Sequence, residues 1–189
     1  GQRRGGAGSA FLEPAVLTEV PAEALGMCGE TFAPVAYVNV FDTGLLHGPE
    51  EIRAAIEQHQ PEVVVVYDDG FNYLTKMCLT VMRDAALRMI TIANNAGCRV
   101  AVNSSDASDH PDMYLKAGAD VVLLGEGEPA LVDVVERWSN GNGIADVAGI
   151  AVSEGEGHRT TPKRPVMRDL DTLPLPAWDL IDVEPYRAI

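Results

Sequence analysis

The chain has 189 residues and a formal net charge of −14 at neutral pH. This length suffices for one large domain that buries roughly 70% of its unfolded surface. The negative charge argues against nucleic acid or an anionic membrane as a partner, because both are bound through clustered Lys and Arg. No apolar segment approaches the roughly 20 residues of a membrane span.

The three cysteines, Cys28, Cys78 and Cys98, form no Cys-x-x-Cys pair. A structural zinc or an iron–sulfur centre within these residues is therefore not expected. An odd number of cysteines without a secretory segment predicts a reducing, cytoplasmic location.

From residue 35 onward, short apolar segments alternate with amphipathic ones. Strands are predicted at Val35–Phe41, Val63–Tyr67, Val100–Val102 and Val121–Leu124, and helices at Pro49–Gln58, Leu74–Asn95, Pro111–Ala117 and Pro129–Asn140. The strands are continuously apolar rather than alternating, which is typical of a parallel sheet covered on both faces. The pattern predicts an α/β fold with a doubly wound, Rossmann-like parallel sheet.

The beginning of the chain departs from this pattern. Gly1–Ser9 is a glycine-rich loop that leads into a segment of helical character, Glu13–Cys28. In a doubly wound sheet such a loop normally follows the first strand. We therefore expect either a first strand upstream of Gly1 or an edge of the sheet that is completed in another way.

The pattern changes again after Gly143. Val147–Val152 and Arg159–Lys163 predict a small β-ribbon around a glycine-containing turn, and Leu173–Pro176 predicts an extended linker. We accordingly divide the chain into a domain of residues 1–145 and a ribbon with linker of residues 146–189.

Open parallel sheets bind ligands at the carboxyl ends of their strands. The segments that follow the predicted strands here, Asp68–Leu74, Asn103–His110 and Gly125–Glu128, are mostly rich in small residues, as is Gly5–Ser9. Such residues allow close backbone approach to a flat ligand and leave amide groups as donors. Each segment alone fits an ordinary tight turn, but together they predict a ligand site on one edge.

Several side chains near this edge invite more specific interpretations. Asp68, Asp69 and Asp106 offer oxygens for Mg²⁺, but their order along the chain differs from that of a phosphoacceptor receiver domain. His110 is either a ligand to a metal or to cobalt, or the first residue of a helix before a proline. His47 is either a loop residue or part of the same edge.

The Gly-x-Gly of Gly125 and Gly127 lacks the third glycine of a dinucleotide fingerprint, so it is weak evidence for NAD. Glu126 and Glu128 complement the positive end of a helix dipole, which explains them without a ligand.

Two segments are the most specific in the chain: Pro111–Glu128, with the sequence PDMYLKAGADVVLLGEGE, and Leu173–Leu180, with LPLPAWDL. Together with Val63–Met77 and Val100–Leu115 they resemble the N-terminal cobalamin-binding domain of cobalamin-dependent radical SAM enzymes. The resemblance implies a flavodoxin-like sheet that holds the corrin over its carboxyl edge while the nucleotide tail descends into the domain.

By position, the resemblance assigns cofactor contacts to three segments: Asp69, Gly70, Phe71, Asn72, Tyr73 and Leu74; Ser104, Ser105 and Asp106; and Gly125, Glu126, Gly127 and Glu128. Many members have two glycines where this chain has Ser104 and Ser105. The glycines at 125 and 127 are interpreted as packing beside the corrin. The chain lacks the D-x-H-x-x-G motif that presents a histidine to cobalt, so base-off cobalamin without a protein ligand is expected, and His110 is the residue that would contradict this.

In this family the cobalamin most often serves methyl transfer from S-adenosylmethionine. The Cys-x-x-x-Cys-x-x-Cys motif for the [4Fe-4S] cluster is not in this chain. The resemblance therefore implies a radical SAM domain elsewhere in the full-length protein as the partner of this one, with no catalytic residue and no metal ligand expected here. The alternative is a flavodoxin-like regulatory or partner-binding domain without corrin.

Overall fold

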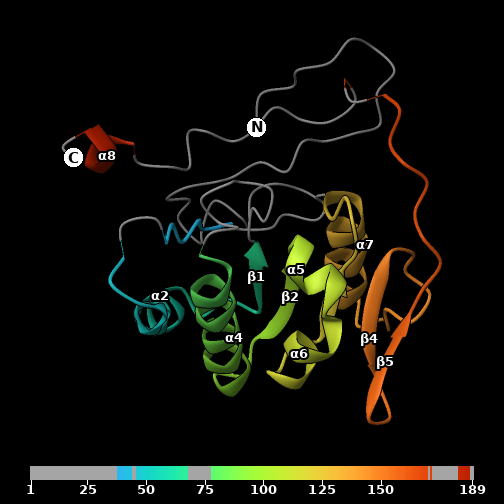
Figure 1. The fold of residues 1–189 in the computed structure, drawn as a ribbon, viewed down its shortest axis with the longest axis horizontal. Helices are drawn as coiled ribbons and strands as arrows, with labels where there is room; N and C mark the ends of the chain where they lie inside the picture. The colour runs from blue at the N-terminus through green and yellow to red at the C-terminus, as the bar shows by residue number, and fades with distance from the viewer. Residues whose placement is uncertain (1–37, 44–45, 68–77, 170, 172–182, 188–189) are drawn as a thin grey trace, which may run out of the picture. The chain divides into compact units, whose positions relative to one another are not determined.

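The computed structural model describes residues 38–43, 46–67, 78–169, 171 and 183–187. Contacts along the chain define a compact unit from Phe41 to Arg168. Figure 1 shows its elements in chain order. The described residues outside this unit include one short helix, α8 (Glu184–Arg187).

The compact unit is built on one five-stranded sheet in the order β1-β2-β3-β4-β5. The strands are β1 (Val63–Tyr67), β2 (Arg99–Asn103), β3 (Val121–Leu123), β4 (Ile150–Glu154) and β5 (Gly157–Thr160). The first three are parallel, whereas β4 runs antiparallel to β3, and β5 antiparallel to β4. The predicted α/β fold with a mostly parallel sheet is confirmed.

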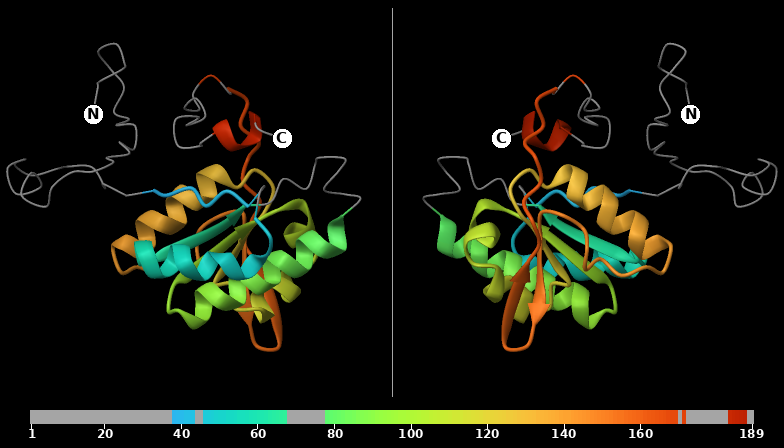
Figure 2. Two further views of the ribbon diagram at one scale, coloured as in Figure 1. Left: turned by 90° about the vertical axis from the view of Figure 1, so that its left-hand side faces the viewer. Right: turned by 90° about the vertical axis from the view of Figure 1, so that its right-hand side faces the viewer.

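Helices cover both faces of the sheet (Figure 2). On one face lie the 3-10 turn η1 (Pro49–Glu51), α2 (Ile52–His59), α4 (Leu79–Asn95), α5 (Ser105–Asp109) and α6 (Pro111–Lys116), and on the other lies α7 (Glu128–Ser139). The strands divide their side chains accordingly, because successive residues point to opposite faces. Val100 and Val102 pack under α4 and α6, whereas Ala101 packs under α7.

Most predicted elements are confirmed to within a few residues, which is the usual uncertainty at helix and strand ends. The predicted strand at Val35–Phe41 is wrong for its described part, since residues 38–41 belong to no strand. Val38 and Val40 are each 48% exposed. β-prone residues alone do not form a strand unless a neighbouring strand pairs with them.

The predicted β-ribbon is confirmed as β4 and β5, and it is an extension of the central sheet. Its second strand ends at Thr160, three residues before the predicted end. Pro162 has no N–H with which to continue a ladder, although its carbonyl still accepts a hydrogen bond from Gly149 at 2.8 Å. None of the described helices is long and apolar enough to cross a membrane.

Candidate functional site

The carboxyl ends of the parallel strands are level. Tyr67 lies opposite Asn103, and Asn103 lies opposite Leu123. The segments that follow β2 and β3 therefore start side by side at one edge of the sheet. Of the predicted site residues, Ser104, Ser105, Asp106, Gly125, Glu126, Gly127 and Glu128 are described, whereas Asp69, Gly70, Phe71, Asn72, Tyr73 and Leu74 lie outside the described residues.

Ser104 starts a helix where the sequence predicted a loop. Its backbone is extended, and its hydroxyl oxygen accepts a hydrogen bond from the Ala107 N–H at 2.9 Å. This is the capping role that serine commonly plays at a helix N-terminus. Ser104 is buried, and Ser105, the first residue of α5, is half-buried. The Ser104 side chain is thus used to cap α5, whereas Ser105 lies nearer the surface.

Asp106 is buried in a polar cluster of three elements. Its Oδ2 accepts a hydrogen bond from Arg83 Nε of α4 at 2.6 Å, and its Oδ1 accepts a second one from Arg83 Nη2. The Tyr114 hydroxyl of α6 also donates to Oδ2, at 2.6 Å. The Asp106 carboxylate therefore receives three hydrogen bonds from two neighbouring helices.

This cluster shifts the pKa of each member. The Arg83 hydrogen bonds hold the pKa of Asp106 below its usual range, and the Asp106 contact raises the pKa of Arg83. Burial, together with the nearby carboxylate, raises the pKa of Tyr114. Arg83 and Asp106 thus form an ion pair of charged groups, and the neutral Tyr114 hydroxyl donates a further hydrogen bond to the Asp106 carboxylate. Among the residues that the structure describes, no group of three His, Cys, Asp or Glu side chains is placed to hold a metal ion.

Asn103 lies in the predicted edge segment Asn103–His110, but the sequence did not predict its contacts. Its Nδ2 donates to the carbonyl oxygens of Leu123 and Gly125, at 3.1 and 3.2 Å. A Cβ on Gly127 would lie 2.6 Å from this Nδ2 atom. The glycine at 127 is thus required by the Asn103 side chain, and packing beside a corrin is not needed to explain it. The available signal was an amide residue directly after an apolar strand.

Gly125 has a different reason to be glycine. Its φ of +70° lies in the left-handed region, which L side chains rarely adopt. A Cβ there would meet no atom of the described residues within 4 Å. As far as the described residues go, the backbone at Gly125 is therefore uncovered at the sheet edge, an arrangement compatible with a large ligand that approaches the main chain closely.

Glu126 and Glu128 are exposed on either side of Gly127. The Tyr67 hydroxyl lies 3.4 Å from Glu128 Oε1, and the Met167 N–H lies 3.4 Å from Glu126 Oε2. These contacts connect the start of α7 with the end of β1 and with the segment after β5. The edge therefore combines the glycine backbone at Gly125 with two exposed carboxylates, Glu126 and Glu128.

Both histidines considered for this edge are exposed. His110 is exposed and occupies the N-cap position of α6, which confirms its placement at a helix start. His47 is exposed, and its backbone N–H donates to Glu51 Oε1 at 2.7 Å.

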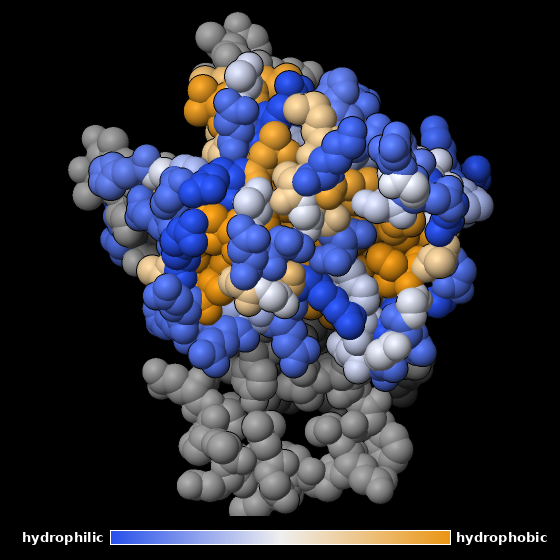
Figure 3. Space-filling view, turned by 90° about the horizontal axis from the view of Figure 1, so that it is seen from below, coloured by the Kyte–Doolittle hydropathy of each residue, from blue (hydrophilic) through white to orange (hydrophobic). Residues whose placement is uncertain are grey.

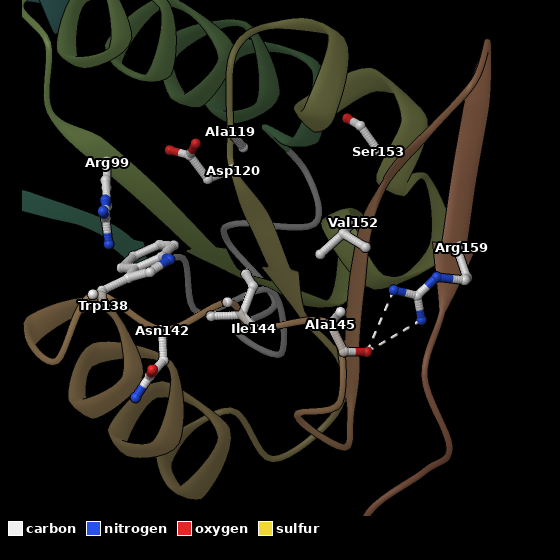
Figure 4. Close-up of a pocket in the computed structure, with 12 residues that line it drawn as sticks. Arg99, Ala119, Asp120, Trp138, Asn142, Ile144, Ala145, Val152, Ser153 and Arg159 are labelled. Atoms are coloured by element: carbon white, nitrogen blue, oxygen red, sulfur yellow. Dashed lines mark hydrogen bonds between the residues drawn. The ribbon is translucent and has the colours of Figure 1, made fainter.

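A hollow of about 680 Å³ lies at the opposite edge, near the amino ends of β2 and β3 (Figure 4). The Arg99 guanidinium lies 5.4 Å from the centre of the Trp138 ring. Asp120 accepts a hydrogen bond from the Val100 N–H at 2.7 Å, and Arg159 donates to the Ala145 carbonyl at 3.3 Å. Seen from below, the described surface has hydrophobic side chains interspersed among hydrophilic ones (Figure 3).

No family model matches the chain. It is similar to the uncharacterized methyltransferase PH0819 of Pyrococcus horikoshii, with 32% identity over 69 residues, or 36% of this chain and 15% of that protein. It is also similar to the uncharacterized methyltransferase sll1242 of Synechocystis sp., with 32% identity over 111 residues, or 59% of this chain and 18% of that protein. The chain spans less than a fifth of the length of these curated relatives.

Proposed function

We propose that this chain is the cobalamin-binding part of an enzyme that transfers methyl groups. The observation that carries the proposal is the open main chain at Gly125, which lies at the same sheet edge as Ser104 and Ser105. The family resemblance assigns cofactor contacts to both segments. The similarity to parts of two proteins that are named methyltransferases supports the methyl-transfer role.

The residues at the edge divide into two groups under this proposal. Ser105 and the backbone of Gly125 form the contact surface, with Glu126 and Glu128 at its rim. Asp106 is buried beneath that surface. Its carboxylate is bound by Arg83 and Tyr114 and is therefore not assigned a contact with the cofactor. When bound, cobalamin supplies a cobalt atom that carries a methyl group, while the protein sets its orientation.

A radical SAM domain in the remainder of the protein completes the proposed enzyme. It would hold S-adenosylmethionine and a [4Fe-4S] cluster. The short coverage of the relatives leaves ample length for such a domain. Sequencing the gene beyond Ile189 tests this part, and the expected finding is a Cys-x-x-x-Cys-x-x-Cys motif.

The binding proposal is tested with hydroxocobalamin. The purified protein is incubated with it and desalted, and the absorbance spectrum is expected to retain about one cobalamin per chain. The Ser105→Phe variant, which fills the proposed contact surface, should lose most of the colour. Ser153→Phe is the matched control, because Ser153 is exposed and lines the hollow at the opposite edge.

The outcomes are distinct. A colourless wild-type protein would sink the proposal and favour a regulatory or partner-binding domain without corrin. Loss of colour in Ser153→Phe, with retention in Ser105→Phe, would instead indicate that cobalamin binds in the hollow at the opposite edge.

We further propose that cobalt receives no histidine from this chain and that the cofactor is base-off. His110 is exposed at the start of α6, so its imidazole is the group to test. The spectrum of the His110→Ala variant is expected to match that of the wild type. A spectrum that changes on this substitution would contradict the proposal.

A further inference from the structure

The Arg83–Asp106 pair connects two helices that are separated along the chain. Arg83 lies in the second turn of α4, and Asp106 lies in the first turn of α5, 23 residues later. The side chains are 23% and 6% exposed. A buried carboxylate without its cation is costly, so the pair strongly favours one arrangement of the two helices.

We propose that Arg83 is a positioning residue for the cofactor edge, an inference that rests on the proposed cobalamin function. Among the described residues of the edge, Arg83 bonds to Asp106 and not to Ser105 or Gly125. It holds Asp106 through two hydrogen bonds in a fixed fork, which restrains rotation as well as distance. Ser105, in the proposed contact surface, immediately precedes Asp106 in the same helical turn.

The surrounding contacts support this role. Tyr114 donates to the same carboxylate from α6, so the anchor point is fixed from two sides. The Ser104 carbonyl accepts hydrogen bonds from the Ser108 N–H and hydroxyl, both at 3.0 Å, which close the helical turn that contains Ser105 and Asp106. A shift of Asp106 is therefore passed on to Ser105.

The same helix provides a matched control. Arg88, also on α4, donates through Nε to Glu50 Oε1 at 2.8 Å, but both of these side chains are about half exposed. Exposed pairs of this kind contribute little to stability. Arg83→Met and Arg88→Met are thus the same chemical change at a buried and at an exposed ion pair.

The first measurement is the dissociation constant for hydroxocobalamin in the full chain, taken where each variant is more than about 95% folded. Under that condition a loss of global stability alone leaves the dissociation constant nearly unchanged. Arg83→Met is expected to weaken binding by about tenfold or more, as for other residues that orient a direct contact. Arg88→Met should stay within about twofold of the wild type.

The second measurement is amide hydrogen exchange without cobalamin. Arg83→Met should speed exchange at Ser108 and His110, whose N–H groups bond to the Ser104 and Asp106 carbonyls. Arg88→Met should leave these amides unchanged. If Arg83→Met does not fold, Arg83→Lys replaces it, because lysine keeps the charge and loses the fork; its binding should be weaker than wild type by about threefold or more.

Each result has one meaning. Wild-type binding with equal affinity in Arg83→Met, or in Arg83→Lys where that variant stands in for it, overturns the positioning role and leaves the proposed function intact. Faster exchange with unchanged affinity also overturns it, since Arg83 would then be structural only. A wild-type protein that binds no cobalamin overturns the proposed function itself.

Discussion

The Asn103 side chain packs directly against Gly127 at the sheet edge. The Asn103 amide lies where a side chain at position 127 would begin, and it also binds the carbonyls of Leu123 and Gly125. Because Asn103 is buried, its amide has little freedom to move aside. One side chain thus fixes the course of the backbone into α7.

The Gly127→Ala variant tests this fit. The φ of Gly127 is −79°, so alanine meets no conformational strain there, only the Asn103 amide. We expect a loss of about 1–3 kcal/mol in the free energy of unfolding, the usual cost of overpacking a buried site. Urea denaturation measures it. Gly143→Ala is the control, because a Cβ at that position meets none of the described atoms within 4 Å, and a similar loss there would contradict the explanation.

The ion pair of Asp106 predicts an acid-sensitive stability. Its pKa is lowered in the folded protein, chiefly by Arg83, so this contribution is complete above the unfolded value of about 3.9 and is lost as the pH falls below it. The free energy of unfolding should therefore decrease between about pH 4 and pH 2 more steeply in the wild type than in Asp106→Asn. Parallel pH profiles from denaturant titrations would contradict this assignment.

At the scale of the elements, a buried threonine joins the two strands of the ribbon at its base. Thr161 Oγ1 accepts a hydrogen bond from the Ile150 N–H at 3.0 Å and donates to the Ile150 carbonyl at 3.2 Å. Both hydrogen bonds lie at the start of β4, where the ribbon leaves the core.

The Thr161→Val variant keeps the shape of the side chain and removes both bonds. Leaving the Ile150 N–H without its acceptor is expected to cost about 1–3 kcal/mol in the free energy of unfolding. Thermal or urea unfolding measures it, and Thr160→Val, at an exposed neighbour, should change stability by no more than about 0.5 kcal/mol. Equal effects at the two positions would show that the hydroxyl bonds are unimportant.

The elements also show what the sequence could predict. The apolar segments of β1, β2 and β3 and the amphipathic pattern of α7 located these elements correctly, because burial on one or two faces leaves a local period. The helix α5 was missed, since serines and aspartates favour turns unless tertiary contacts hold them. Those contacts come from Arg83, which lies 23 residues away from Asp106.

The candidate site follows the same rule. The sequence predicted that Ser104, Gly125 and their neighbours share one edge, because parallel topology alone requires it. It could not predict that Asp106 would be bound by Arg83, or that Gly127 would pack on Asn103. Both facts depend on side chains from different elements. The contacts of all three assigned segments with cobalamin, Asp69–Leu74, Ser104–Asp106 and Gly125–Glu128, stay a prediction.

At the scale of the whole molecule, the compact unit from Phe41 to Arg168 contains the five described strands and both described hydrophobic clusters. We expect a fragment of residues 41–168 to fold by itself, since it retains its own core. Circular dichroism and urea denaturation of the fragment should show a helical signal and one cooperative transition. A gradual, non-cooperative change would contradict this.

The antiparallel ribbon also bears on aggregation. It places β5, a strand of four residues, at one edge of the described sheet, with His158 and Arg159 in it. Short edge strands with charged side chains resist pairing with a strand of another molecule. The proline that follows Thr161 removes one further donor from this edge. The composition of the ribbon therefore disfavours the addition of a strand from a neighbouring molecule on this side of the described sheet.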